Sequence, residues 1–296
     1  MFESGDYMID LHTHTVHSDG MLTVDELINN AIENNVDVIS ITDHDTISGL
    51  SEYQNMYLKN EILVIPGVEF STDTYYLGRK TKIHLLGYGY KVGDKTINQV
   101  LHELYIRRFN DNKEYIEDLI KRFHYLSFDY FNGFDYGKYG WLYKNILNYI
   151  GTFVNNEQLE LLKEYLISNK PHYNKYNESV EDMIKLIHFC DGYAVFAHPQ
   201  KCDATKEEFQ KLVIYLKNLG LDGLETYHIE SNQNDRNYIH GLALKYDLYE
   251  TGGSDFHSFK YANGVGDSNI RFSQDYEPLL VKKLIKEKKV LGDISE

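Results

Sequence analysis

The feature that most constrains this chain is a regular alternation of strand-like and helix-like segments. Short apolar runs recur along the sequence, and each is followed by a stretch of helical character. This alternation predicts βα units with a parallel sheet, which places the chain in the α/β class. We expect seven strands, at residues 8–11, 38–42, 63–68, 83–88, 193–197, 223–227 and 249–253.

One long segment interrupts this alternation between the fourth and fifth expected strands. It covers residues 92–177 and opens with apolar residues at helical spacing, among them Leu104, Ile116 and Leu119. A plain loop of that length is uncommon in a compact domain, so the segment is predicted to be a helical insert that caps an active site. Residues 1–91 and 178–296 are expected to form the main domain.

Polar groups that can bind metal ions gather near the ends of the expected strands. In parallel sheets closed into a barrel, the carboxyl ends of the strands meet at one rim, where active sites form. His84 is an exception, because it lies nearer the start of its strand than its end. In chain order the groups are His12, His14, Asp19, His44, Glu69, His84, His198, His228, Asp255 and His257.

A single polar residue at a strand end is more often a cap or a solvated side chain than a metal ligand. The set as a whole indicates a metal centre, because nearly every strand delivers an imidazole or a carboxylate to the same rim. Mixed nitrogen and oxygen ligands suit zinc, manganese or iron better than calcium.

The same residues give the chain a resemblance to a known family. It resembles the polymerase and histidinol phosphatase (PHP) family over almost its whole length, and most of all the stand-alone phosphoesterases. That branch includes nucleoside 3',5'-bisphosphate phosphatases and short-RNA 5' exonucleases. The resemblance implies a distorted, TIM-like barrel of seven βα units, with a helical insert between strands 4 and 5. The blocks that carry it are residues 12–14, 18–20, 42–45, 66–69, 84–88, 197–199, 225–228 and 253–257.

The resemblance also implies how two or three divalent ions would be held. Glu69 would bridge two of the ions, which makes it a catalytic residue as well as a ligand. The ligands of the first ion would be His12, His14, Glu69 and Asp255, those of the second Glu69, His84 and His198, and those of the third Asp19, His44 and His257.

Such a centre would hydrolyse phosphomonoesters, because a hydroxide shared by two ions can attack phosphorus in line. His228 is a candidate to protonate the leaving oxygen or to contact the phosphate. Arg107 and Arg108, at the start of the insert helix, could face a second phosphate. Asp43, Asp45, His17 and Ser18 flank ligands and are expected to orient them.

One stretch departs from the pattern of the resembled branch. Its members usually carry Arg-Pro-His in the insert, where it helps to hold the substrate phosphate. This chain has residues 134–141 there instead, without that triplet. Lys138 or Lys144 could substitute, but a lysine offers a point charge and not the planar fork of arginine.

Composition limits the partners of the chain. A formal net charge of -15 argues against binding to a long nucleic acid, which needs a basic surface. No apolar run approaches the roughly 18 residues that span a bilayer, and the start of the chain lacks a signal-peptide pattern, so a cytoplasmic protein without membrane contact is expected. The expected partner is a small phosphorylated molecule, of nucleotide or short oligonucleotide type.

Three other functions fit part of the pattern. A histidinol-phosphate phosphatase would share the metal-binding residues, and an accessory module could bind metal without catalysis. An amidohydrolase also uses a His-x-His strand end in a barrel, but it often places a lysine between two metals, and no lysine ends a strand here. The complete ligand set favours an enzyme over a non-catalytic module.

Overall fold

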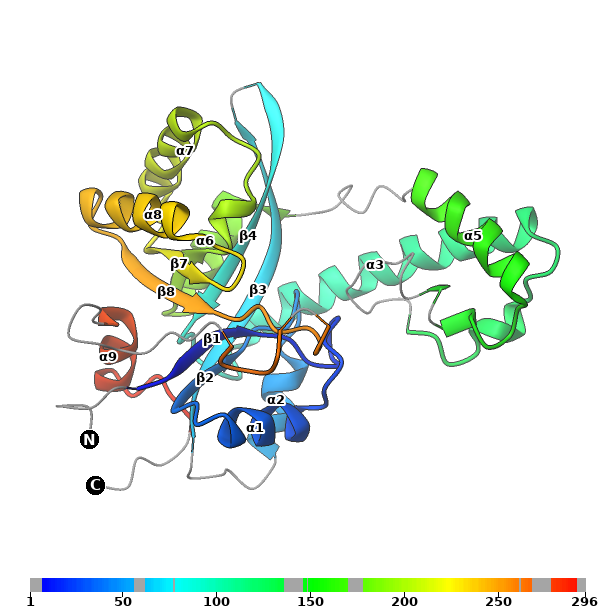
Figure 1. Cartoon of the computed structure of the whole chain (residues 1–296), viewed down its shortest axis with the longest axis horizontal. Coiled ribbons are helices and arrows are strands. Elements are labelled where there is room, and N and C mark those ends of the chain that lie inside the picture. The colour runs from blue at the N-terminus through cyan, green and yellow to red at the C-terminus, as the bar shows by residue number, and fades with distance from the viewer. Residues whose placement is uncertain are drawn as a thin grey trace. The chain divides into compact units, whose positions relative to one another are not determined.

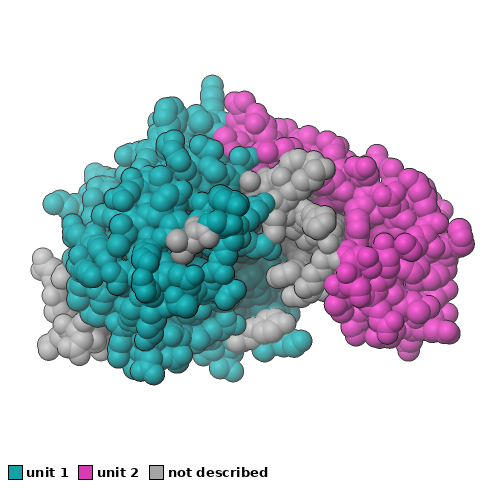
Figure 2. Space-filling model, turned by 90° about the horizontal axis from the view of Figure 1, so that it is seen from above, with its two compact units in different colours: residues 1–98, 178–296 teal, residues 99–177 magenta. Residues whose placement is uncertain are grey.

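The computed structural model describes residues 7–55, 62–76, 78–135, 146–147, 149–169, 178–260, 262–267 and 278–291. Its chain forms two compact units, which Figure 2 shows in teal and magenta. The first unit is discontinuous and comprises residues 1–98 and 178–296, and the second comprises residues 99–177. The second unit is therefore inserted into the sequence of the first.

The first unit is built on a mixed sheet that nearly closes into a barrel, and the seven expected strands are all present (Figure 1). Neighbouring strands pair in the order β1-β2-β3-β4-β6-β7-β8. A short strand that the sequence did not predict, β5 (Glu178–Ser179), pairs with β3. The bounds are β1 Ile9–Thr13, β2 Val38–Ile41, β3 Leu63–Tyr76, β4 Arg79–Tyr88, β6 Tyr193–Phe196, β7 Gly223–His228 and β8 Tyr249–Gly253.

The prediction of a wholly parallel sheet is wrong at β4. This strand runs antiparallel to both of its neighbours, β3 and β6. It forms a long hairpin with β3, and the ladder extends from the pair Gly67 and Tyr88 to the pair Tyr76 and Arg79. Only a few residues connect the two strands, whereas a parallel pair needs a crossover of a dozen or more. The insert follows β4, as expected.

Hydrogen bonds between β1 and the segment after β8 bring the two ends of the sheet together. The backbone N–H of His14 donates to the carbonyl of Phe256 at 3.0 Å. The buried carboxylate of Asp10 accepts from the N–H and the hydroxyl of Ser254, at 2.8 and 2.6 Å, and from the N–H of Gly266 at 2.7 Å. Burial raises the pKa of Asp10 in spite of these hydrogen bonds.

Helices pack around the sheet in the first unit. Helix α6 contacts β3, β4 and β6, whereas α8 contacts β7 and β8. Thr23, Ser179 and Thr205 cap three of these helices, since each accepts a hydrogen bond from the third residue of the helix that follows. The helices are α1 Val24–Glu33, α2 Ser48–Asn55, α6 Val180–Phe189, α7 Lys206–Leu219, α8 Gln233–Lys245, α9 Leu279–Lys286 and the short 3-10 helix η2 Pro199–Lys201.

The second unit has a hydrophobic core of its own. Helix α3 (Lys95–Arg122) enters it from β4, and η1 (Phe128–Phe131) and α5 (Asn156–Ser168) follow. Ile116 and Leu119, which the helical spacing singled out, are buried against Leu162 and Leu166. Lys138 and Lys144 lie outside the described residues. None of the helices described in the two units is long and apolar enough to cross a membrane.

Candidate metal centre

The nine residues proposed from the sequence as metal ligands lie together in the first unit. Eight of them form three overlapping groups in which the ligand atoms of each group lie within 4.8 Å of one another. His198, the ninth, contacts Glu69. The groups are His14, Asp19, His44 and His257; His12, His14, Glu69 and Asp255; and His44, Glu69 and His84.

Glu69 lies at the middle of this cluster, on β3. Its side chain is fully buried. One carboxylate oxygen lies 2.8 Å from Nδ1 of His84 and 3.0 Å from Nε2 of His198. The other lies 3.1 Å from Nε2 of His12 and 3.1 Å from Nδ1 of His44. Each oxygen therefore faces a different set of imidazoles, as a carboxylate that bridges two ions would.

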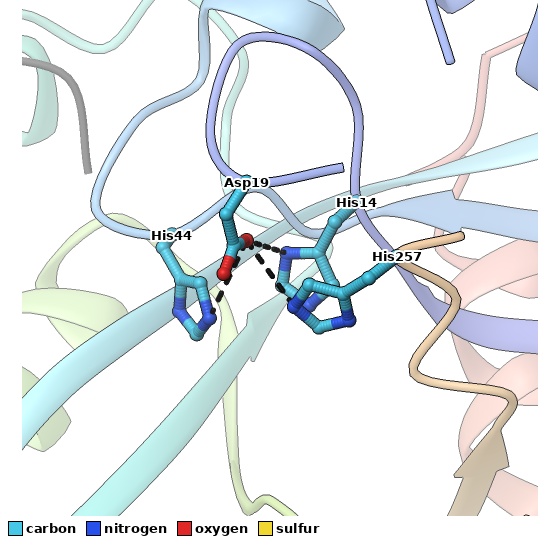
Figure 3. A group of neighbouring side chains, drawn as sticks. All are labelled: His14, Asp19, His44 and His257. Carbon is cyan, nitrogen blue, oxygen red and sulfur yellow. Dashed lines mark ion pairs between the residues drawn. The ribbon is translucent and has the colours of Figure 1, made fainter. Parts of the chain in front are cut away.

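Asp19 is surrounded by three imidazoles, as Figure 3 shows. Its Oδ1 atom lies 3.2 Å from Nε2 of His257, 3.8 Å from Nδ1 of His14 and 3.9 Å from Nε2 of His44. Asp19 and His14 come from the loop after β1, and His44 from the loop after β2. His257 follows β8, so this group joins residues from both ends of the first unit.

The arrangement of ligand atoms fits a cation better than a proton. Nε2 of His14 lies 3.2 Å from Oδ1 of Asp255 and 3.3 Å from an oxygen of Glu69, yet it meets neither with hydrogen-bond geometry. Oδ1 of Asp19 is likewise buried without a hydrogen bond among the described residues. Buried polar atoms are rarely left in this way, and a metal ion would satisfy them.

Hydrogen bonds behind two of the imidazoles leave a nitrogen available for a metal. Nδ1 of His12 lies 2.9 Å from the buried carboxylate of Glu225 and donates to it, so Nε2, which faces Glu69, is the nitrogen that a metal ion would bind in place of a proton. Nδ1 of His257 lies 2.7 Å from the carbonyl of Asp255 and has the same effect on its own Nε2. Metal-binding histidines are commonly oriented by such a carboxylate or carbonyl.

The electrostatics of the cluster show strong coupling between its acids and its imidazoles. Burial opposes the protonation of His14, but Asp255 and Glu69 outweigh it and raise the pKa of His14 to about 10. Burial also opposes the ionisation of Glu69, yet the neighbouring imidazoles, led by those of His44 and His12, hold its pKa well below the usual value. In the absence of metal, a proton on His14 therefore supplies positive charge beside these carboxylates, whereas burial lowers the pKa of His44.

Glu225 contacts two of the proposed ligands, although from the sequence it was placed only within the block 225–228 and was given no role. It lies on β7, fully buried, and one of its oxygens faces His12 while the other accepts the backbone N–H of His198. It thus connects two of the proposed ligands. A carboxylate in the interior of an expected strand was the available signal, since such a group is buried only with partners.

Lys201 is the second residue that the sequence did not single out. Its Nζ atom lies 2.9 Å from Oδ2 of Asp255 and 3.1 Å from Oε2 of Glu230. Nε2 of His228 lies 3.2 Å from the same oxygen of Asp255. The backbone N–H of Glu230 donates to Nδ1 of His228 at 3.0 Å, so the proton of this imidazole is on Nε2, which donates to Asp255.

Two of the four flanking residues expected to orient the ligands, Asp43 and Ser18, lie beside His14. Asp43 accepts from the N–H and the hydroxyl of Thr15, both at 2.7 Å, and from the hydroxyl of Ser18 at 2.6 Å. The Ser18 hydroxyl lies 3.5 Å from Nδ1 of His14. Asp43 therefore fixes the loop that carries His14.

The other two flanking residues act further from the ligands. Asp45 accepts the backbone N–H of Ser71, at 2.9 Å, and so ties the end of β2 to β3. His17 points elsewhere, because its Nε2 atom pairs with an oxygen of Glu52 at 2.7 Å near the surface. An orienting role for His17 has no support in its contacts. Arg107 and Arg108 lie on α3 in the second unit, and their role stays a prediction.

Comparison with known proteins decides the family. The model of the family described as "PHP domain" matches residues 10–237, which is more than half of the chain. The chain belongs to the PHP domain family. This match covers the cluster except for the ligands that follow β8.

Two curated PHP-domain relatives align with most of the chain. A 5'-3' exoribonuclease of Haemophilus influenzae is 30% identical over 250 residues, which cover 84% of this chain and 89% of the relative. A 3',5'-nucleoside bisphosphate phosphatase of Chromobacterium violaceum is 26% identical over 283 residues, which cover 92% and 93% of the two chains. Both relatives thus match the PHP barrel and the insert together.

A solved structure supports the fold. It is described as an amidohydrolase from Chromobacterium violaceum with bound sulfate, and it superposes with a TM-score of 0.74 at 24% sequence identity. The superposition covers 96% of this chain and 97% of that one. The PHP-type barrel with its insert is therefore a known architecture.

Proposed function

We propose that this PHP-domain protein is a metal-dependent phosphoesterase that hydrolyses phosphomonoesters of nucleotides or short oligonucleotides. The observation that carries the proposal is the cluster of nine imidazole and carboxylate side chains that has Glu69 at its middle. Relatives named as an exoribonuclease and as a nucleoside bisphosphate phosphatase support the choice of substrate class. Nothing in those names favours a histidinol-phosphate phosphatase or a non-catalytic module.

The cluster would hold two or three divalent ions, of zinc, manganese or iron. Glu69 would bridge two ions, one of them also held by His84 and His198. When bound, the ions supply an activated water and neutralise charge on the phosphate. The remaining ligands would be His12, His14 and Asp255 for one ion and Asp19, His44 and His257 for another.

The protein side chains would orient the ligands and the substrate. Glu225 keeps the Nε2 atom of His12 directed at the cluster. His228 presents an Nε2–H group beside Asp255, which suits a hydrogen bond to a phosphate oxygen or to the leaving oxygen. Arg107 and Arg108 would bind a second phosphate of a bisphosphorylated substrate or of the next nucleotide.

Turnover of a panel of phosphate esters tests this function. Protein supplied with Mn²⁺ is incubated with simple phosphomonoesters, 3',5'-bisphosphorylated nucleosides and 5'-phosphorylated short RNA, and released phosphate is measured. We expect release from the nucleotide substrates. Glu69→Gln should lower kcat by about a hundredfold or more and lower the bound metal, because a bridging carboxylate is lost.

Glu52→Gln serves as the control, since Glu52 is an exposed acid that pairs with His17 outside the cluster. It should leave turnover unchanged. Arg107→Gln and Arg108→Gln should raise KM for bisphosphorylated substrates more than for monoesters. Undiminished activity of Glu69→Gln would contradict the bridging role, and equal KM values in the arginine variants would contradict the second-phosphate role.

A further inference from the structure

A lysine at the edge of the cluster has contacts that metal binding alone does not explain. Lys201 ends η2, three residues after His198. Its ammonium group lies between two carboxylates of different character. The side chain of Asp255 is 10% exposed and belongs to the cluster, whereas that of Glu230 is 59% exposed and lies after β7. The charge of Lys201 therefore stands at the boundary between the cluster and solvent.

The inner contact of Lys201 is shared. Oδ2 of Asp255 accepts from both Lys201 and Nε2 of His228, while Oδ1 of Asp255 faces His12 and His14 at 3.4 and 3.2 Å. A cation bound to Oδ1 would partly neutralise the negative charge of the Asp255 carboxylate. The attraction between Asp255 and the ammonium group would then weaken.

The outer contact of Lys201 is easily replaced. An exposed ion pair such as the one with Glu230 contributes little to stability, because water and salt screen it. An anion that arrives beside the cluster can therefore take the place of Glu230 at small cost. A lysine is ordinarily protonated near neutral pH, so an ammonium group is available to such an anion.

We propose that Lys201 binds the phosphoryl group of the substrate, and that Glu230 holds this lysine when no phosphate is bound. The ligand is a tetrahedral oxyanion, either the phosphate of the ester or the inorganic phosphate released from it. This inference rests on the proposed phosphoesterase function. It assigns to that function a cationic side chain of the first unit that would contact the phosphate. Glu230 competes with the phosphate for the same ammonium group.

Binding of inorganic phosphate tests the role of Lys201. Phosphate is titrated calorimetrically into protein that is loaded with Mn²⁺ and freed of excess metal. Lys201→Met should weaken binding by about tenfold or more, because a charge-assisted hydrogen bond is lost. Lys201→Arg, which keeps the charge, should stay within about threefold of the original protein.

Lys211→Met is the matched control. Lys211 pairs with Glu207 at 2.6 Å on the exposed face of α7, in the same unit. Its loss should leave phosphate binding unchanged. Thermal melting and elemental analysis of each variant show whether it is folded and carries its metal.

The variant Glu230→Gln distinguishes a Lys201 that binds phosphate from a Lys201 that has only a structural role. If Glu230 competes with phosphate, its neutralisation should tighten phosphate binding by about two- to fivefold. In the double variant Lys201→Met/Glu230→Gln this gain should be absent. A lysine that only braces Asp255 predicts unchanged or weaker binding in Glu230→Gln.

Phosphate binding by Lys201→Met within twofold of the original protein, or a gain from Glu230→Gln that survives in the double variant, would overturn the inference. Turnover of phosphate esters by the same preparations separates this result from a failure of the proposed function. If the original protein turns over esters and Lys201→Met binds phosphate normally, only the role of Lys201 is wrong. If phosphate binding depends on Lys201 but no ester is hydrolysed, the proposed function is wrong.

Discussion

The imidazole of His12 illustrates how strongly single side chains in this protein depend on the groups behind them. Its Nε2 atom can serve a metal only because Nδ1 is occupied by Glu225. The same carboxylate fixes the backbone of His198, where the chain adopts a left-handed conformation that non-glycine residues rarely take. One acid on β7 thus orients ligands from two other strands.

Glu225→Gln should therefore weaken metal binding by about ten- to a hundredfold, because an amide no longer selects the Nδ1–H form of His12. Metal affinity of the folded variant is measured by competition with a chelator. Glu250→Gln is the control, since Glu250 pairs with His240 at 3.0 Å away from the cluster and should have no effect. Equal metal affinity in Glu225→Gln and the original protein would show that Glu225 does not orient His12.

The raised pKa of His14 predicts how the stability of the metal-free protein changes with pH. The value rises from the usual 6.5 to about 10 on folding, so protonated His14 stabilises the folded state. That stabilisation is complete below pH 6.5 and is lost as pH rises toward 10. The lowered pKa values of Asp19 and Asp255 act on the acid side, where stability is lost as pH falls below about 4.

Thermal melting across about pH 6 to 10 checks this expectation. With a chelator present, Tm should fall steadily as pH rises over this range. With Mn²⁺ bound, the fall should be much smaller, because the metal supplies the positive charge that the protons gave. A Tm of the metal-free protein that stays level or rises between these pH values would contradict the assigned shift of His14.

The residue types and their positions at strand ends, together with the resemblance to the PHP family, were enough to predict which nine side chains meet. Spacing along the chain could not show what lies behind them. Glu225 and Lys201 act through contacts with residues that are distant in sequence, such as His12 and Asp255. Their roles follow from the pairing of strands, which a single sequence without structure does not display.

The β3–β4 hairpin shows what the pattern of elements missed. His84 seemed misplaced near the start of its strand, but β4 runs opposite to its neighbours, so its early residues lie toward the same rim as the carboxyl ends of the others. The register places His84 opposite Ser71, two residues beyond Glu69 on β3. The reversed direction of the strand thus explains the ligand that seemed displaced.

The sequence hid this hairpin because its outer part is polar. β3 continues to Tyr76 through serine, threonine and aspartate, which do not form an apolar run. This polar part of β3 is a strand because it pairs with β4, and such pairing cannot be read from the residues of β3 alone. Gly78, with a φ of 76°, marks the turn and was the available sign.

The contact between β1 and β8 leaves no room for a side chain at Gly253. A Cβ atom there would lie 2.5 Å from the backbone nitrogen of His12 and 2.5 Å from its Cβ. Gly253→Ala should therefore push the two strands apart, lower the free energy of unfolding by about 1 to 3 kcal/mol and weaken metal binding. Denaturant unfolding and metal titration measure the two effects.

Gly241→Ala is the matched control on α8, where an added Cβ meets no described atom within 4 Å. It should leave metal binding unchanged and raise stability by up to about 1 kcal/mol, since alanine favours a helix. If Gly253→Ala were as stable as Gly241→Ala, the approach of β8 to His12 would be looser than the structure shows.

Charge is distributed very unevenly over the whole molecule. The second unit contains ten basic and ten acidic residues, so the formal net charge of -15 falls entirely on the first unit. Bound divalent cations would offset part of that charge where the cluster lies. The second unit is thus the part of the chain that repels a phosphorylated ligand least.

The separate core of the second unit predicts that it can be loosened without damage to the metal centre. Leu162→Ala should cost about 2 to 5 kcal/mol there, because Leu162 is fully buried in that core. Hydrogen exchange should show lost protection in α5 but not in β1 or β8, and metal content should be unchanged. The neighbouring Leu161, which is 51% exposed, gives the control variant Leu161→Ala.

Loss of bound metal in Leu162→Ala, or an equal loss of protection in β1, would show that the two units do not unfold separately. The helical spacing of apolar residues correctly predicted a helical segment in this part of the chain. The separate core could not be predicted, since it brings together residues that are far apart in the sequence, such as Ile116 and Leu166, in one cluster.

The discontinuity of the first unit has a consequence for biosynthesis. A nascent chain that leaves the ribosome exposes His12 through His84 first, then the whole second unit, and only afterwards the last three proposed ligands, His198, Asp255 and His257. Domains generally fold as they are synthesised. The early histidines therefore lack part of their proposed ligand set until the segment after the second unit has been translated, and loading of the complete centre with metal has to follow the synthesis of His257.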